Sequence, residues 1–241
     1  MKGGIMKEKS RAAIGFRKWF SYGMIIVLMV LMIPAMPSEA SAKSIALSKY
    51  RALLNKSRIS VLPQGKAIEQ YKMIDGEYDY YRVKYWSSKA SKVKFCLGCI
   101  DGDDIPDLIL SDKDCGYGVW TFKNGSFRCL FWQDYYGSPV GFYYKKGVFR
   151  QNEYTGESPF SRQYYKLQIG KKRQLLQEEG CQFRPNGGIK VWNYTLMSGS
   201  KEKSVSCAAY YKNLKKYTGN TKMTPIYLHN NTSANKKKYI K

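Results

Sequence analysis

The sequence predicts a mainly β protein, either a curved antiparallel meander sheet or a barrel-like sandwich. One short helix is expected near each end of the chain that follows residue 42. Three observations predict this class: alternation of apolar and polar side chains in several short segments, an Asn-Gly hairpin signal, and turn signals at short intervals. Closely spaced turns favour consecutive antiparallel strands over units in which strands alternate with helices.

Several segments have the side-chain pattern of strands. Apolar and polar side chains alternate over residues 78–86 and again over residues 92–97, which places the apolar set on one face of a sheet. Residues 108–110 form a continuous apolar run, which is typical of a strand buried on both faces.

The clearest hairpin is predicted around Asn124-Gly125. Residues 119–122 and 127–130 flank this dipeptide, which suits a type I′ turn because both central positions take positive φ. Further hairpins are expected at Lys146-Gly147, Gly170-Lys171 and Gly187-Gly188.

Two helices are expected. The first has Ser44 as its N-cap and an apolar stripe formed by Ala46, Leu47, Tyr50, Leu53 and Leu54. The second extends from Cys207 to Tyr217, with Ser206 as its N-cap and Gly219 as its C-terminal stop.

Residues 1–42 have the features of a signal peptide. Basic residues precede an apolar run from Met24 to Met36, and Ala40-Ser41-Ala42 supplies small residues for cleavage before Lys43. An uncut membrane anchor is the alternative, but the apolar run is short and Pro34 interrupts it. We therefore expect a secreted protein without a transmembrane segment after cleavage, with one β-rich domain over residues 43–229 and a basic tail over residues 230–241.

The net charge of +23 predicts attraction to polyanions. Outside a cell the expected partner is an anionic cell-wall polymer or polysaccharide, which would retain the protein at the wall; charge that serves only solubility is the alternative. The aromatic side chains are not interleaved with the main lysine tract as in base-stacking proteins, so nucleic acid is not favoured. The candidate polyanion-binding residues are Lys212, Lys215, Lys216, Lys222, Lys236, Lys237 and Lys238.

The six cysteines leave the redox chemistry open. In an exported chain they permit up to three disulfides of undetermined connectivity, and the alternative is free buried thiols. Cys96 and Cys99 have C-x-x-C spacing without a second such pair or a nearby histidine, so a zinc or redox centre is not favoured.

One segment carries the pattern of a cation-binding loop. Asp101, Asp103 and Asp107, with the Ile105 carbonyl between them, have roughly the spacing that gathers oxygen ligands around Ca²⁺. The segment resembles the calcium loops of the dockerin-like and integrin FG-GAP-like kind, which also occur in uncharacterised secreted proteins of clostridia-type Firmicutes. The resemblance implies Ca²⁺ as the ligand and no particular activity.

The loop departs from that pattern at two positions. Cys99 stands where the pattern has Asp, and a protonated thiol is a poor Ca²⁺ ligand. Asp104 stands where the pattern has Gly, which takes positive φ without strain. Two interpretations follow, a weakened calcium site or an acidic turn that keeps its shape without metal, and the lost carboxylate favours the second.

The sequence contains no catalytic constellation. The single histidine, His229, has no accompanying nucleophile motif, and no phosphate-cradling glycine loop is present. The leading hypothesis is a non-catalytic surface or cell-wall-associated binding module, with no cofactor required. The alternative is a secreted carbohydrate-active enzyme that uses Asp carboxylates near an aromatic hairpin, where the aromatic candidates are Trp120, Trp132, Tyr135 and Tyr136.

Overall fold

The computed structural model describes residues 39–64, 68–74, 77–83, 86–134, 137–154, 160–169 and 171–241. The predicted signal peptide therefore lies outside the described residues except for residues 39–42. Residues 39–241 form one compact unit.

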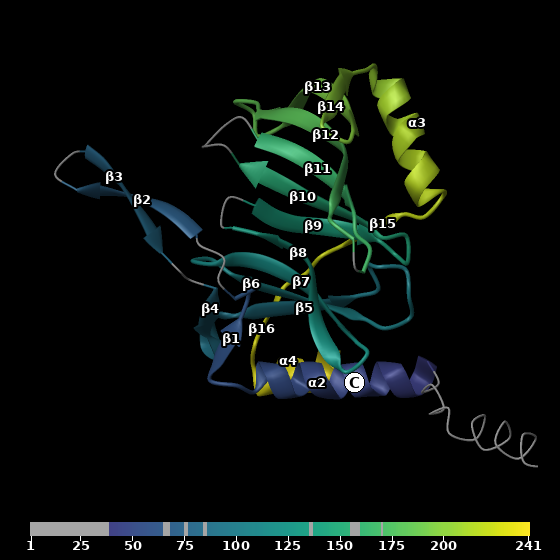
Figure 1. The fold of residues 1–241 in the computed structure, drawn as a ribbon. Coiled ribbons are helices and arrows are strands. Elements are labelled where there is room, and N and C mark those ends of the chain that lie inside the picture. The colour runs from purple at the N-terminus through teal and green to yellow at the C-terminus, as the bar shows by residue number, and fades with distance from the viewer. Residues whose placement is uncertain are drawn as a thin grey trace, which may run out of the picture. The chain divides into compact units, whose positions relative to one another are not determined.

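The mainly β class is confirmed, and the sheets are open and antiparallel (Figure 1). A five-stranded sheet has the order β16-β5-β6-β7-β8, formed by His229–Asn230, Lys94–Gly98, Asp107–Asp112, Gly116–Lys123 and Ser126–Gln133. A seven-stranded sheet has the order β14-β13-β12-β11-β10-β9-β15, formed by Lys201–Ser204, Ile189–Ser198, Gln174–Phe183, Phe160–Lys166, Val148–Tyr154, Gly137–Tyr143 and Met223–Pro225. Two small ribbons pair β1 (Arg58–Ser60) with β4 (Ser87–Lys89), and β2 (Ile68–Ile74) with β3 (Glu77–Val83).

Within the described part of the chain, three α-helices accompany the sheets, and a short 3-10 helix, η1 (Ala90–Lys92), follows β4. Helix α2 (Glu39–Leu54) begins five residues before Ser44, so the prediction of Ser44 as its N-cap is wrong. Helix α3 (Cys207–Thr218) confirms the second prediction: the Ser206 hydroxyl accepts a hydrogen bond from the Ala209 amide, and Gly219 ends the helix with a φ of 60°. Helix α4 (Ser233–Tyr239) lies in the segment predicted as a basic tail.

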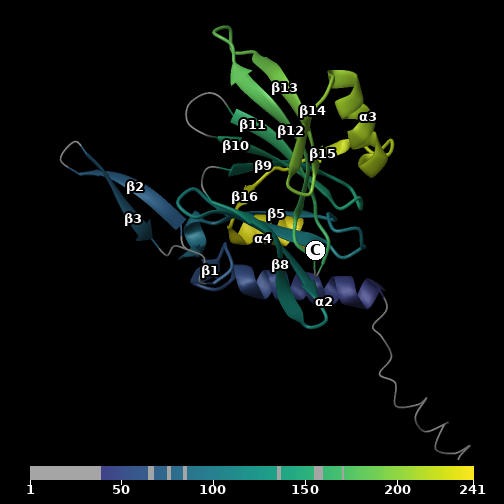
Figure 2. The same cartoon turned by 45° about the horizontal axis from the view of Figure 1, so that its top comes forward.

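Three apolar cores connect these layers (Figures 1 and 2). The first lies between α2 and the five-stranded sheet, the second between the two sheets, and the third between the seven-stranded sheet and α3. Strand β6 contributes Leu108 and Leu110 to the first core and Ile109 to the second. Both faces of this strand are buried, which explains its uninterrupted apolar sequence.

Candidate functional site: an acidic loop and a basic surface

The acidic loop connects β5 to β6, and the pairing of Gly98 with Asp107 closes its base. The turn between β9 and β10 holds the loop in place. The Lys145 amide donates to the Cys99 carbonyl at 2.9 Å, and the Gly147 amide donates to the Ile100 carbonyl at 2.7 Å. The loop is therefore fixed by a neighbouring sheet and by its own strands.

The carboxylates of the loop also organise its backbone. Asp107 is fully buried, and its Oδ2 accepts hydrogen bonds from the amides of Ile100 at 2.8 Å and Asp101 at 3.2 Å. Asp103 Oδ1 accepts from the Ile105 amide at 2.9 Å. The structure thus brings together the three predicted carboxylates, and Ile105 joins them through its amide rather than through the predicted carbonyl.

Two carboxylate oxygens in this loop are buried without a hydrogen-bond partner among the described residues: Asp101 Oδ2 and Asp107 Oδ1. Burial, followed by the charge of Asp103, raises the pKa of Asp101 to about 6. Burial, followed by the charge of Asp101, raises the pKa of Asp107 well above its ordinary value. The Thr121 hydroxyl favours the ionised form of Asp107, although the two groups lack the geometry of a hydrogen bond.

Two lysines from neighbouring turns compensate part of this negative charge. Lys123 Nζ lies 2.9 Å from Asp103 Oδ2, and Lys145 forms an ion pair with Asp104. The hydrogen bond with Asp103 raises the pKa of Lys123. Asp104 stands where the calcium pattern has Gly, and here it serves as an ion-pair partner.

Cys99 occupies the first position of the loop as a neutral thiol. Burial, followed by the charge of Asp107, raises the pKa of this thiol. Within the described part of the chain, no group of three or more His, Cys, Asp or Glu side chains is arranged to hold a metal ion.

The predicted polyanion-binding lysines fall into two separate groups. Lys212, Lys215 and Lys216 are exposed on α3, which packs through Tyr210 and Leu214 on the seven-stranded sheet, and Lys222 follows that helix. Lys236, Lys237 and Lys238 belong to α4, which lies beside α2 at the other side of the five-stranded sheet (Figure 1).

Helix α4 is firmly attached to α2. Ile240, just after α4, is fully buried in the first core with Leu47 and Leu54. Lys236 Nζ contacts the Leu54 carbonyl at 3.4 Å and Asn55 Oδ1 at 2.6 Å, so this lysine caps the C-terminal end of α2, where positive charge is favourable.

This packing assembles a basic surface of which the sequence predicted the lysines near the C-terminus but not the basic residues of α2. We call it the basal surface and define it by Lys43, Lys49, Arg51, Lys56, Lys236, Lys237, Lys238 and Lys241. Residues 40–60 and 230–241 contain no acidic residue. A cavity of about 290 Å³ on this surface is lined by Lys43, Ser44, Leu47, Ser48, Arg51 and Lys241. The signal that was missed is the set of basic residues in and just after α2, with no acidic residue between residues 40 and 60.

The aromatic hairpin has a structural role. Phe122 and Phe127 from β7 and β8 pack edge to face with ring centroids 5.1 Å apart, and Trp120 Nε1 donates to the Val61 carbonyl at 3.0 Å. Trp132 packs against the first core, whereas Tyr135 and Tyr136 lie outside the described residues.

Among the described helices, none is both long and apolar enough to cross a membrane. No protein-family model matches the chain, and no curated protein or solved structure shows significant similarity to it.

Proposed function

We propose that the protein is an exported, non-catalytic module that binds anionic polymers of the cell surface through the basal surface. One observation carries the proposal: α2 and α4, from opposite ends of the described chain, pack together and gather eight basic residues around one pair of helices. The leader-like pattern of residues 1–42 supports export.

Electrostatics supports a polymer over a small ligand for this surface. The basic side chains are spread along two helices and are mostly exposed, so each contributes little alone. A polymer with repeated negative charges engages many of them at once, and that attraction weakens as salt screens it.

The test compares two triple variants that remove the same charge. Lys49→Gln/Lys237→Gln/Lys238→Gln changes the basal surface, and Lys212→Gln/Lys215→Gln/Lys216→Gln changes α3. Cosedimentation with purified cell walls across a salt series is expected to fall at least about tenfold for the basal variant, at roughly 1 kcal/mol per lysine near an anionic surface. The α3 variant should stay close to wild type. Equal losses would remove the assignment to the basal surface, and a wild-type protein that does not sediment at low salt would remove the function.

A second function is favoured by the two unpartnered carboxylate oxygens in the acidic loop. We infer that this loop takes a divalent cation such as Ca²⁺ in place of Lys123, which now pairs with Asp103, and that the carboxylates rearrange on binding because they are not grouped around a metal ion in this structure. Asp101, Asp103, Asp107 and the Ile105 carbonyl are the candidate ligands, in keeping with the resemblance to calcium loops.

Calorimetric titration of the full chain with Ca²⁺, together with thermal melts with and without chelator, tests this second function. Lys123→Gln should strengthen Ca²⁺ binding, Asp107→Asn should abolish it, and Asp114→Asn, outside the loop, should leave it unchanged. If neither wild type nor Lys123→Gln gives binding heat, and chelator leaves both melting temperatures unchanged, the loop is a purely structural turn.

A further inference from the structure

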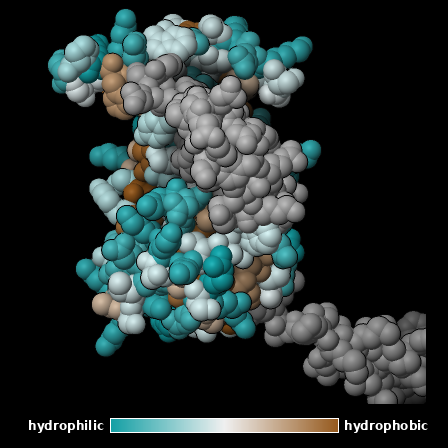
Figure 3. All heavy atoms as spheres, turned by 90° about the vertical axis from the view of Figure 1, so that its left-hand side faces the viewer, coloured by the Kyte–Doolittle hydropathy of each residue, from teal (hydrophilic) through white to brown (hydrophobic). Residues whose placement is uncertain are grey.

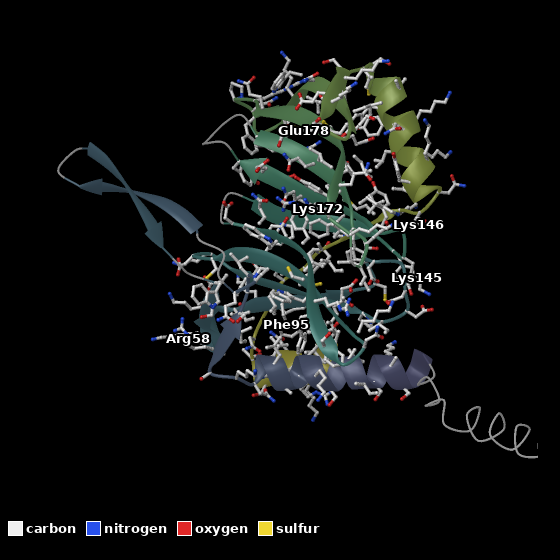
Figure 4. The ribbon with its side chains drawn as sticks, viewed as in Figure 1. Arg58, Phe95, Lys145, Lys146, Lys172 and Glu178 are labelled. Atoms are coloured by element: carbon white, nitrogen blue, oxygen red, sulfur yellow. The ribbon has the colours of Figure 1, made fainter. Side chains whose placement is uncertain are left out.

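A second cavity lies between the β1–β4 ribbon, η1 and the turn that connects β6 to β7. Its volume is about 400 Å³, and it lies well away from the acidic loop: Figure 4 shows Arg58 at one side of the structure and Lys145 at the other. In the lower part of the face shown in Figure 3, where no grey atoms lie in front, most residues are hydrophilic. The cavity is lined by Arg58, Ser87, Ser88, Lys89, Lys92, Asp112, Asp114 and Cys115.

Two cations of this cavity face each other across the ribbon. Arg58 and Lys89 are direct partners in the antiparallel pairing of β1 and β4. Like charges directly opposite each other disfavour a strand pair, and an anion bound between them would offset this repulsion. Arg58 donates to the Ser87 carbonyl at 3.0 Å and to Ser87 Oγ at 3.2 Å, and Lys89 makes no hydrogen bond or ion pair with the described residues.

The carboxylates of the cavity already have hydrogen-bond partners, and among the described residues only Lys92 forms an ion pair with one of them. Asp112 accepts hydrogen bonds from the Ser88 hydroxyl at 2.7 Å and from the Asp114 amide at 2.8 Å. Asp114 Oδ2 pairs with Lys92 Nζ at 3.0 Å. Burial, followed by the charge of Asp112, raises the pKa of Cys115 to about 12, so this thiol is neutral.

The remaining donors suit a tetrahedral oxyanion. Arg58 offers a planar fork of N–H groups, Lys89 offers an ammonium group, and the Ser87 hydroxyl accepts from Arg58 and so keeps its own proton to donate. Three separate donor groups match the several oxygens of a phosphoryl group better than the two coplanar oxygens of a carboxylate.

The cavity also adjoins the basal surface. The Ala90 amide of η1 donates to the Ser57 carbonyl just after α2, and Asn231, just before α4, donates through Nδ2 to the Ala90 carbonyl. We propose that this cavity binds a phosphoryl group and that the anionic polymer is therefore a phosphate-bearing one. The polymer part of this inference rests on the proposed function, whereas phosphate binding by the cavity does not.

Titration of the full chain with inorganic phosphate at low ionic strength, monitored by NMR, tests whether the cavity itself binds phosphate. Arg58→Gln/Lys89→Gln should weaken phosphate binding about tenfold or more, as expected for lost hydrogen bonds to a charged group. Lys212→Gln/Lys215→Gln removes the same charge from α3 and should bind phosphate like wild type. Arg58→Lys, which keeps the charge, should show an intermediate loss because the planar fork is gone. Equal affinities in all variants, or acetate binding as tightly as phosphate, would overturn the assignment.

Pull-down on immobilised polyphosphate and on poly-glutamate separates the two proposals. Wild type should prefer polyphosphate, and Arg58→Gln/Lys89→Gln should lose that preference while keeping its binding to poly-glutamate. If the preference survives in this variant, the cavity proposal fails while the basal surface stands. If neither polymer binds but inorganic phosphate binds through Arg58 and Lys89, the proposed function fails while the cavity proposal stands.

Discussion

Gln163 joins two carboxylates from neighbouring strands of the seven-stranded sheet. Its Nε2 donates to Glu153 Oε2 at 2.5 Å and to Glu178 Oε2 at 3.2 Å, while its Oε1 accepts from Gln151 at 2.7 Å and from the Tyr165 hydroxyl at 2.8 Å. One amide thus holds two half-buried acids close together. Burial, followed by the charge of Glu153, raises the pKa of Glu178 against the opposing hydrogen bond from Gln163.

Glu178→Gln is expected to flatten the dependence of stability on pH. A raised folded-state pKa means that the folded protein binds this proton more tightly than the unfolded chain does. The resulting stabilisation is fully present below the ordinary glutamate pKa and is lost as pH rises through the raised one. Gln cannot titrate, so the variant should lose less stability than wild type over that window, measured as urea midpoints at several pH values. Glu202→Gln, on exposed β14, removes only a minor contributor to the raised pKa of Glu178 and should flatten the profile much less than Glu178→Gln does. Parallel profiles for Glu178→Gln and wild type would contradict the prediction.

At the residue scale, the position of the acidic loop could be predicted from the sequence, but the ion pairs that its carboxylates form could not. The spacing of Asp101, Asp103 and Asp107 was sufficient to place them in one turn between strands. The ion pairs of Asp103 with Lys123 and of Asp104 with Lys145 depend on two other hairpins, and no local pattern relates those lysines to the loop. Likewise, the pairing of Arg58 with Lys89 depends on a ribbon that joins segments separated by the β2–β3 hairpin.

At the element scale, α2 is joined to the five-stranded sheet by one buried hydroxyl. Tyr50 is fully buried, and its hydroxyl accepts a hydrogen bond from the Phe122 amide at 3.0 Å. Its ring also lies 5.9 Å from that of Phe127. The helix that carries three of the eight residues of the basal surface is therefore positioned by a contact with β7.

Tyr50→Phe should destabilise the fold while keeping its ring packing. The change leaves the buried Phe122 amide without its acceptor, which costs about 1–3 kcal/mol. Urea denaturation at neutral pH should show a lower midpoint with an unchanged slope. Tyr227→Phe, whose side chain is 69% exposed, should unfold like wild type. A midpoint for Tyr50→Phe equal to that of wild type would show that the hydroxyl does not hold α2.

Local turn chemistry was the most predictive element-scale signal. Asn124 and Gly125 both take positive φ, at 52° and 76°, as their hairpin requires, and Gly187 does so at 78° between β12 and β13. Helix α4 and strand β16 were not predicted, because seven and two residues are too few to show periodicity. The start of α2 was misplaced because Ser44 resembles an N-cap, yet the helix continues through it.

At the scale of the whole molecule, the described fold is held by apolar cores without covalent links. Between the sheets, Phe131 contacts Phe149 at 5.4 Å and Tyr165 at 4.9 Å between ring centroids. All six cysteines are free, so the structure contains thiols and not the disulfides that the sequence also permitted. Cys96 lies in β5, and Cys99 lies at the start of the acidic loop.

The thiols should therefore react in an order set by their burial. Cys207 is exposed at the start of α3, whereas the other five are buried or half-buried and burial raises the pKa of each, to about 12 for Cys115 and Cys129. Because the thiolate is the nucleophile, alkylation of the native protein at mildly basic pH should modify Cys207 first and the others only after unfolding in urea. Mass spectrometry of intact and digested protein measures this order, and denatured protein labelled at all six positions is the control. A melting temperature that falls on addition of reductant, with fewer than six thiols labelled after unfolding, would show that disulfides contribute to the fold after all.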